Sequence, residues 1–115
     1  MQRDDRIRIQ HMLEAAKEAI LFSENRTRDD LDSDRSLGLS LLKLIKIVGE
    51  AATQVSDQSR ETFSMIPWRN IIGMRNRLIH AYFDVNLSIV WDTVTTDLPP
   101  LVAALEEILS AEDGE

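Results

Sequence analysis

The sequence contains no cysteine, and only three of its 115 residues are proline and four are glycine. Without cysteine, the chain has no disulfide framework, no cysteine-ligated zinc site and no thiol nucleophile. The scarcity of proline and glycine leaves long stretches free of the residues that interrupt helices. These absences favour a helical chain that is stabilised by an ordinary hydrophobic core.

Long apolar runs and a surplus of basic residues are also missing. The first ten residues, MQRDDRIRIQ, are charged and do not resemble the apolar centre of a signal peptide. No apolar run approaches the length of a membrane span, so we expect a soluble, cytoplasmic protein. The net charge of −7 argues against a wide nucleic-acid-binding surface. The length predicts a single domain, residues 1–115.

Apolar residues recur at helical spacing in four long segments, which predict helices over about 5–23, 35–55, 67–83 and 87–109. Asn86 is a candidate N-cap for the last segment, and Pro99 and Pro100 mark a kink or a fresh start within it. The stretch LSIVWDTVTTDL has the valine and threonine content of a strand, but no second strand is available to pair with it. We therefore predict an all-α, antiparallel bundle of four to five helices. Residues 110–115 are expected to fray.

The segment RNRLIHAY, residues 75–82, places polar residues inside an otherwise apolar helical pattern. Arg75 follows Ile71 by one turn and precedes Leu78 by another, which predicts that it lies on the packed face. A buried guanidinium must be paired, or must face a cleft or an interface. His80 stacks over Asn76. Gly73 shares the row of His80, and its bare backbone would let a partner helix or a ligand come close.

Arginine and histidine together suit phosphate chemistry, because arginine offers a planar donor fork and histidine transfers protons near neutral pH. The more common role of such residues on a helix is ordinary hydrogen bonding. The block 62–83 contains three arginines and no acidic residue, so it carries a local charge of +3. Arg69 and Arg77 in this block are therefore candidate RNA-binding residues. Glu50 has two possible roles, a hydrogen bond to Arg75 across the bundle or a rim salt bridge, and we favour the second.

Other candidate sites are weaker. His11 lies among polar residues and is expected to face solvent. Two histidines without clustered carboxylates do not indicate a metal site, and the sequence contains no glycine-rich phosphate loop. Trp68 and Trp91 are expected to pack in the core or at an interface. We therefore expect no metal and no cofactor.

Three segments carry a resemblance to a known family: IVGEAA (residues 47–52), IPWRNIIGMRNRLIHAYFDVN (66–86) and VWDTVTTDLP (90–99). They resemble HepT-like toxins, the DUF86 type of the HEPN superfamily, along more than half of the chain. Arg75, four residues, His80, one residue and Tyr82 match the Arg-x4-His-x-Tyr signature of that family.

The resemblance implies a homodimer in which the motifs of two subunits form one composite, metal-independent endoribonuclease site. In that site Arg75 would stabilise the scissile phosphate, His80 would transfer protons, and Asn76 would orient either His80 or the phosphate. It also implies a partner, a minimal nucleotidyltransferase antitoxin that neutralises the toxin by transferring AMP from ATP to Tyr82. The resemblance also allows higher hetero-oligomers with that antitoxin.

Two hypotheses follow. The first is a ribonuclease toxin. The second is a non-catalytic helical module that docks a nucleotidyltransferase and serves as its substrate. The intact pair of Arg75 and His80 favours the first, because a binding module needs neither.

Overall fold

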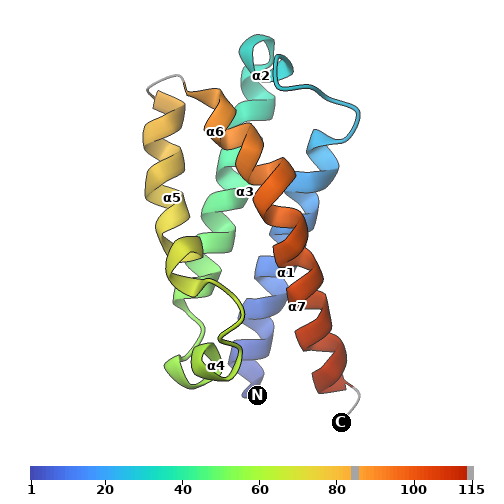
Figure 1. Cartoon of the computed structure of the whole chain (residues 1–115), viewed down its shortest axis with the longest axis vertical. Coiled ribbons are helices and arrows are strands. Elements are labelled where there is room, and N and C mark those ends of the chain that lie inside the picture. The colour runs from blue at the N-terminus through green and yellow to red at the C-terminus, as the bar shows by residue number, and fades with distance from the viewer. Residues whose placement is uncertain (84–85, 114–115) are drawn as a thin grey trace.

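The computed structural model describes residues 1–83 and 86–113, except for the side chains of residues 81 and 82. All regular structure within these residues is helical, which confirms the predicted all-α class (Figure 1). The elements in chain order are α1 (Arg3–Ser23), α2 (Asp30–Ser33), α3 (Arg35–Thr53), α4 (Asp57–Thr62), α5 (Trp68–Phe83), α6 (Leu87–Asp92), the π-helical η1 (Thr93–Asp97) and α7 (Leu98–Asp113).

The long helices run alternately up and down the bundle, as predicted (Figure 1). The helix α3 packs between α1 and α5, and α7 packs against α1. The continuous α6–η1–α7 segment starts beside α5 and crosses the bundle towards α1 (Figure 1). The core is aliphatic, and its largest fully buried side chains are Ile9, Met12, Leu41, Ile45, Ile66, Leu78, Leu98 and Leu105. Among the described residues, no helix is both long enough and apolar enough to cross a membrane.

The two consecutive prolines do not break the last long segment. Leu98 donates its backbone N–H to the carbonyl of Thr93, five residues back, which is the bond of a π-turn. Pro99 and Pro100 then fall in the first turn of α7, where a missing N–H has little cost. At the predicted kink or fresh start, the chain changes from π- to α-helical winding. The stretch that could have been a strand is helical, as predicted. Asn86 lies at the N-cap of α6 but makes no side-chain capping bond.

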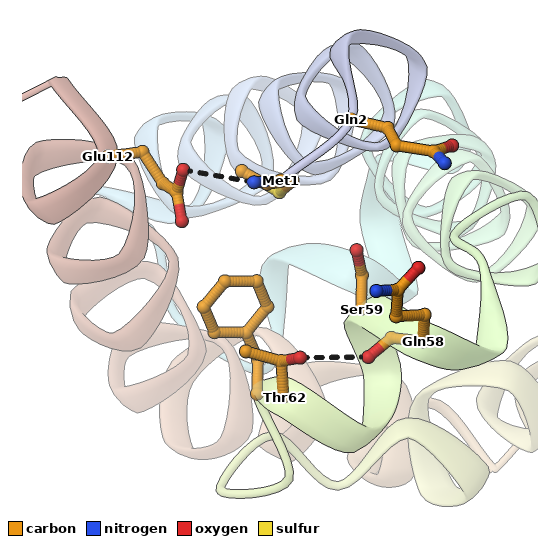
Figure 2. Close-up of a pocket in the computed structure, with 7 residues that line it drawn as sticks. Met1, Gln2, Gln58, Ser59, Thr62 and Glu112 are labelled. Atoms are coloured by element: carbon orange, nitrogen blue, oxygen red, sulfur yellow. Dashed lines mark hydrogen bonds and ion pairs between the residues drawn. The ribbon is translucent and has the colours of Figure 1, made fainter. Parts of the chain in front are cut away.

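The base of the bundle holds both ends of the described chain. The N-terminal amine of Met1 lies 3.3 Å from a carboxylate oxygen of Glu112, and Figure 2 shows these two residues at the rim of a cavity whose other side is formed by α4. Arg6 forms an ion pair with Asp113. Residues 110–113, where fraying is expected, belong to the last turn of α7. Residues 114–115 lie outside the described residues.

Asp5 ties α1 to α4. Its buried carboxylate accepts hydrogen bonds from the backbone N–H of Ser56 at 2.9 Å and from the hydroxyls of Ser56 and Ser59, each at 2.6 Å. Burial alone would raise the pKa of Asp5, but these hydrogen bonds outweigh it and hold the pKa below its usual value.

Asp34 starts α3. Its carboxylate accepts hydrogen bonds from the backbone N–H of Leu37 and from the hydroxyl of Ser36, and it forms an ion pair with Arg26 at 2.8 Å. The hydrogen bond from Arg26, followed by those from Leu37 and Ser36, lowers the pKa of Asp34 to about 2. An aspartate at this position caps the helix and complements its dipole.

Candidate functional site

The helix α5 follows Pro67, one residue later than predicted, and presents one apolar face to the core. Ile71, Met74 and Leu78 are buried along that face, together with Trp68 at its start. Trp68 also donates its indole N–H to the carbonyl of Phe63, which fixes the entry to the helix. Trp91 on α6 is partly buried against the same core. Both tryptophans therefore pack as expected.

A glycine sets the distance between α3 and α5. A Cβ atom added at Gly49 would lie 3.3 Å from the backbone carbonyl oxygen of Ile71 and 3.7 Å from the Cβ of Arg75. The two backbones therefore meet closely at the residue directly before Glu50. Sequence reasoning missed this role of Gly49, although a glycine within the small-residue run VGEAA is a recognisable signal of close helix packing.

Arg75 lies at the rim of the α3–α5 contact. Its Nη1 atom is 3.3 Å from Oε1 of Glu50, and the two side chains are 43% and 50% exposed. The prediction that Arg75 lies on the packed face is therefore wrong, because its position at the flank of α5 lets the long side chain reach solvent. The two roles considered for Glu50 coincide, since the bond that crosses from α3 to α5 is itself a rim salt bridge.

The outward face of α5 carries a regular stripe of exposed residues, which we call the outward stripe: Arg69, Gly73, Asn76, His80 and Phe83. Successive members are four and three residues apart, which is the spacing of a helix-packing seam. Phe83 is 75% exposed. A Cβ atom added at Gly73 would meet no atom of the described residues within 4 Å. Gly73, Asn76 and His80 thus share one face, as predicted, but that face looks away from the core.

Arg75 and His80 point in different directions within one chain. They are five residues apart, which places them about 140° apart around the helix. Arg75 lies on the flank next to α3, and His80 lies on the outward stripe. Asn76 stands one turn before His80 and lies between these two directions. A site that uses both groups on one phosphate therefore needs side-chain reach or a second α5.

Two adjoining hollows flank the pair of Glu50 and Arg75. One, of about 210 Å³, opens towards α5 and is lined by Asn76, Ile72 and Gly49 in addition to the pair. The other, of about 520 Å³, extends over α3 to α1 and includes Arg8 and His11. His11 is exposed, as predicted, but it faces the same hollow as Arg75, which sequence reasoning did not anticipate.

The remaining predicted site residues either lie away from the two hollows beside Arg75 or have side chains outside the described residues. Arg69 belongs to the outward stripe. Arg77 lies on the opposite flank of α5, where it lines a cavity of about 370 Å³ together with Asp97. The backbone of Tyr82 belongs to α5, but its side chain lies outside the described residues, so the prediction that it accepts AMP remains a prediction. In the described part of the chain, no three His, Asp or Glu side chains lie close enough to hold a metal ion together.

The chain is an all-α antiparallel bundle that exposes a cluster of Arg75, Asn76 and His80 on one helix. A family model described as Ribonuclease HepT-like matches residues 12–108, a range that includes this cluster and Glu50. The chain therefore belongs to the HepT-like ribonuclease family.

Individual relatives agree with this assignment. A protein named "Putative RNase TTE0752", from Caldanaerobacter subterraneus subsp. tengcongensis, is 34% identical over 104 residues, which cover 90% of this chain and 93% of that protein. A protein named "Probable ribonuclease HepT", from Thermococcus cleftensis, is 34% identical over 100 residues, or 84% of this chain and 91% of that protein. No solved structure is matched by the chain.

Proposed function

We propose that this chain is a metal-independent endoribonuclease that acts as the toxin of a toxin–antitoxin pair. The observation that carries the proposal is the exposure of Arg75, Asn76 and His80 on one helix of a chain that belongs to a ribonuclease family. A side chain that binds and cleaves RNA must reach solvent, and all three do.

The proposed reaction is an internal transfer within RNA. His80 takes the proton of a 2′-hydroxyl, and the 2′-oxygen then forms a bond to the adjacent phosphorus. The bond from phosphorus to the 5′-oxygen breaks, and that oxygen receives a proton, which leaves a cyclic phosphate on one product. Arg75 donates hydrogen bonds to the phosphoryl oxygens, where negative charge builds up.

The arrangement of α5 favours a composite site made by two subunits. Arg75 and His80 of one chain are about 140° apart on the helix. Two α5 helices that meet through their outward stripes would bring His80 of one subunit towards the Arg75 flank of the other. Gly73 would allow a close approach, and Phe83 would supply apolar contact. One His80 would then act as the base, and the partner subunit's His80 would act as the acid.

A nucleotidyltransferase encoded beside this chain would switch the activity off. The phenol oxygen of Tyr82 would attack the α-phosphorus of ATP, and pyrophosphate would leave. The AMP group would then sit two residues after His80, where its bulk and negative charge would exclude an RNA backbone.

The activity is tested with purified protein and RNA in the presence of EDTA. Wild type should cleave, and His80→Ala and Arg75→Ala should each lose roughly 10²- to 10⁴-fold in rate. Glu106→Ala, which changes an exposed residue of α7, serves as the control and should cleave normally. If RNA stays intact after incubation with the wild-type protein, the ribonuclease proposal is refuted, and the non-catalytic docking module becomes the better hypothesis.

The off-switch needs a separate experiment. The chain is incubated with ATP and the product of the neighbouring nucleotidyltransferase gene, and its mass is measured. A gain of one or more AMP groups that Tyr82→Phe abolishes would support the proposal. A gain that persists in Tyr82→Phe would place the acceptor elsewhere.

A further inference from the structure

Arg8 on α1 differs from the other arginines of the chain. In the described residues it is the only arginine that is partly buried and has neither an ion pair nor a hydrogen bond. The other partly buried arginines have partners: Arg6 binds Asp113, Arg26 and Arg28 bind aspartates, and Arg60 binds backbone carbonyls. A partly buried guanidinium that is not paired with a carboxylate is available to an anion from outside.

The hollow that holds Arg8 also holds one side of the proposed catalytic site. This α1–α3 groove has a volume of about 520 Å³, and its polar lining comes from Arg8, His11, Glu50, Thr53, Gln54 and Arg75. Arg8 and His11 are three residues apart on α1 and therefore share one face. Glu50, Thr53 and Arg75 also line the smaller hollow that reaches Asn76, so the two hollows form one continuous track over α5, α3 and α1.

The charge of the track suits a polyanion, although the whole chain is acidic. Arg8 and Arg75 contribute two positive charges. The single carboxylate in the lining, Glu50, is already shared between Arg75 at 3.3 Å and Lys46 at 4.0 Å. His11, Thr53 and Gln54 add hydrogen-bond donors that can reach phosphate or ribose oxygens.

We propose that the α1–α3 groove binds backbone phosphates of single-stranded RNA next to the phosphate that is cleaved. Arg8 is the main phosphate ligand, and His11 assists it. The RNA would run from Asn76 on α5, over Glu50 and Thr53 on α3, to α1. This inference rests on the proposed ribonuclease function and adds a binding subsite. Arg8 and His11 precede the range 12–108 that the family model matches.

The first test measures binding without cleavage. A fluorescein-labelled RNA of about 12 nucleotides is titrated with the His80→Ala chain, with and without Arg8→Gln, and its anisotropy is followed at several salt concentrations. Arg8→Gln should weaken binding by about three- to tenfold at low salt. The plot of log K against log salt has a negative slope, and loss of one phosphate contact should make that slope shallower by about 0.7. His11→Gln should have a smaller effect.

Matched variants separate a local contact from general charge. Arg35→Gln removes the same charge from an exposed position at the other end of α3, about 22 Å from Glu50 along the helix. It should change the affinity and the slope much less than Arg8→Gln does. Arg8→Lys keeps the charge and should restore much of the binding. Circular dichroism of each variant shows that the fold is intact.

The second test uses cleavage in the chain that retains His80. Arg8→Gln should raise KM on the long RNA several-fold more than KM on a dinucleotide, which is too short to reach α1. Equal effects of Arg8→Gln and Arg35→Gln on both substrates would overturn the subsite. If wild type binds RNA but does not cleave it, the proposed reaction fails, and the anisotropy comparison still decides the subsite.

Discussion

Glu50 on α3 accepts a hydrogen bond from Arg75 on α5, with 3.3 Å between the carboxylate oxygen and the guanidinium nitrogen. The same oxygen lies 4.0 Å from the ammonium of Lys46. The position of Arg75 is therefore held from the neighbouring helix, at the place where Gly49 brings the two backbones together. RNA that binds Arg75 has to compete with Glu50 for the guanidinium.

Glu50→Gln should tighten RNA binding. The glutamine keeps an oxygen that can accept from Arg75, but the negative charge that repels phosphate is removed. We expect Kd for labelled RNA to fall several-fold at low salt in the His80→Ala chain, with a small change in stability because exposed ion pairs contribute less than about 1 kcal/mol. Lys43→Gln, at an exposed position of the same helix, should not tighten binding. Weaker binding by Glu50→Gln would mean that the full carboxylate is needed to hold Arg75 in place.

Two glycine substitutions should differ in their effect on stability. Gly73→Ala should raise the free energy of unfolding by about 0.5–1 kcal/mol, because alanine favours the helix and its methyl group meets open space. Gly49→Ala should not show this increase in stability, because its methyl group would lie 3.3 Å from a backbone carbonyl oxygen of α5 and would have to displace it. Urea unfolding of both variants measures the difference. An equal increase in the free energy of unfolding at both positions would show that α3 and α5 can move apart at little cost.

Gly73→Trp tests the second subunit. If two α5 helices pack through their outward stripes, an indole at the exposed Gly73 blocks that approach, so the protein should become monomeric and lose cleavage. Light scattering during size-exclusion chromatography measures the mass. Ser110→Trp, at an exposed position of α7, is the size-matched control. A dimer that survives Gly73→Trp would move the interface to another face.

Acid should weaken the cap of α3. The pKa of Asp34 is lowered from 3.8 to about 2 in the folded chain, so its charge stabilises the fold above pH 3.8 and loses that effect as the pH falls towards 2. Asn keeps the capping oxygen but not the charge. Asp34→Asn should therefore have a lower urea midpoint than wild type at pH 6, with the gap closing by about pH 2.

The matched control for that experiment is Asp92→Asn, which changes an exposed aspartate without a capping bond. Its midpoint should follow that of wild type at each pH. If the difference in urea midpoint between Asp34→Asn and wild type stays constant from pH 6 to pH 2, the lost stability comes from altered geometry of the cap and not from the lost charge.

Asp5→Ala should cost about 1–3 kcal/mol of unfolding free energy, because it leaves donors from Ser56 and Ser59 without their acceptor at a buried position. Asp4→Ala changes the exposed neighbour and should stay within about 0.5 kcal/mol. Thermal unfolding of the two variants gives the comparison. Similar losses would mean that the acidic first turn of α1 matters more than the contact with α4.

The helical spacing of apolar residues was enough to predict the long helices, because it shows directly which face of each helix is buried. Ile9, Leu41 and Leu78 are buried where their spacing places them. It failed for Arg75, since the spacing gives the direction of the Cβ atom but not where a long side chain ends. Two further features could be located only in the folded chain. The closeness of Gly49 to Ile71 depends on how α3 meets α5, and the nearness of Arg8 to Arg75 depends on three helices at once.

The base of the bundle offers a way to observe assembly from a distance. Both ends of the described chain lie there, whereas the last turn of α5 lies at the far end (Figure 1). Since the chain has no cysteine, a thiol introduced by Ser110→Cys in the last turns of α7 would carry a single dye on each subunit. Resonance energy transfer between donor- and acceptor-labelled chains would then report subunit exchange while the whole of α5 remains unmodified.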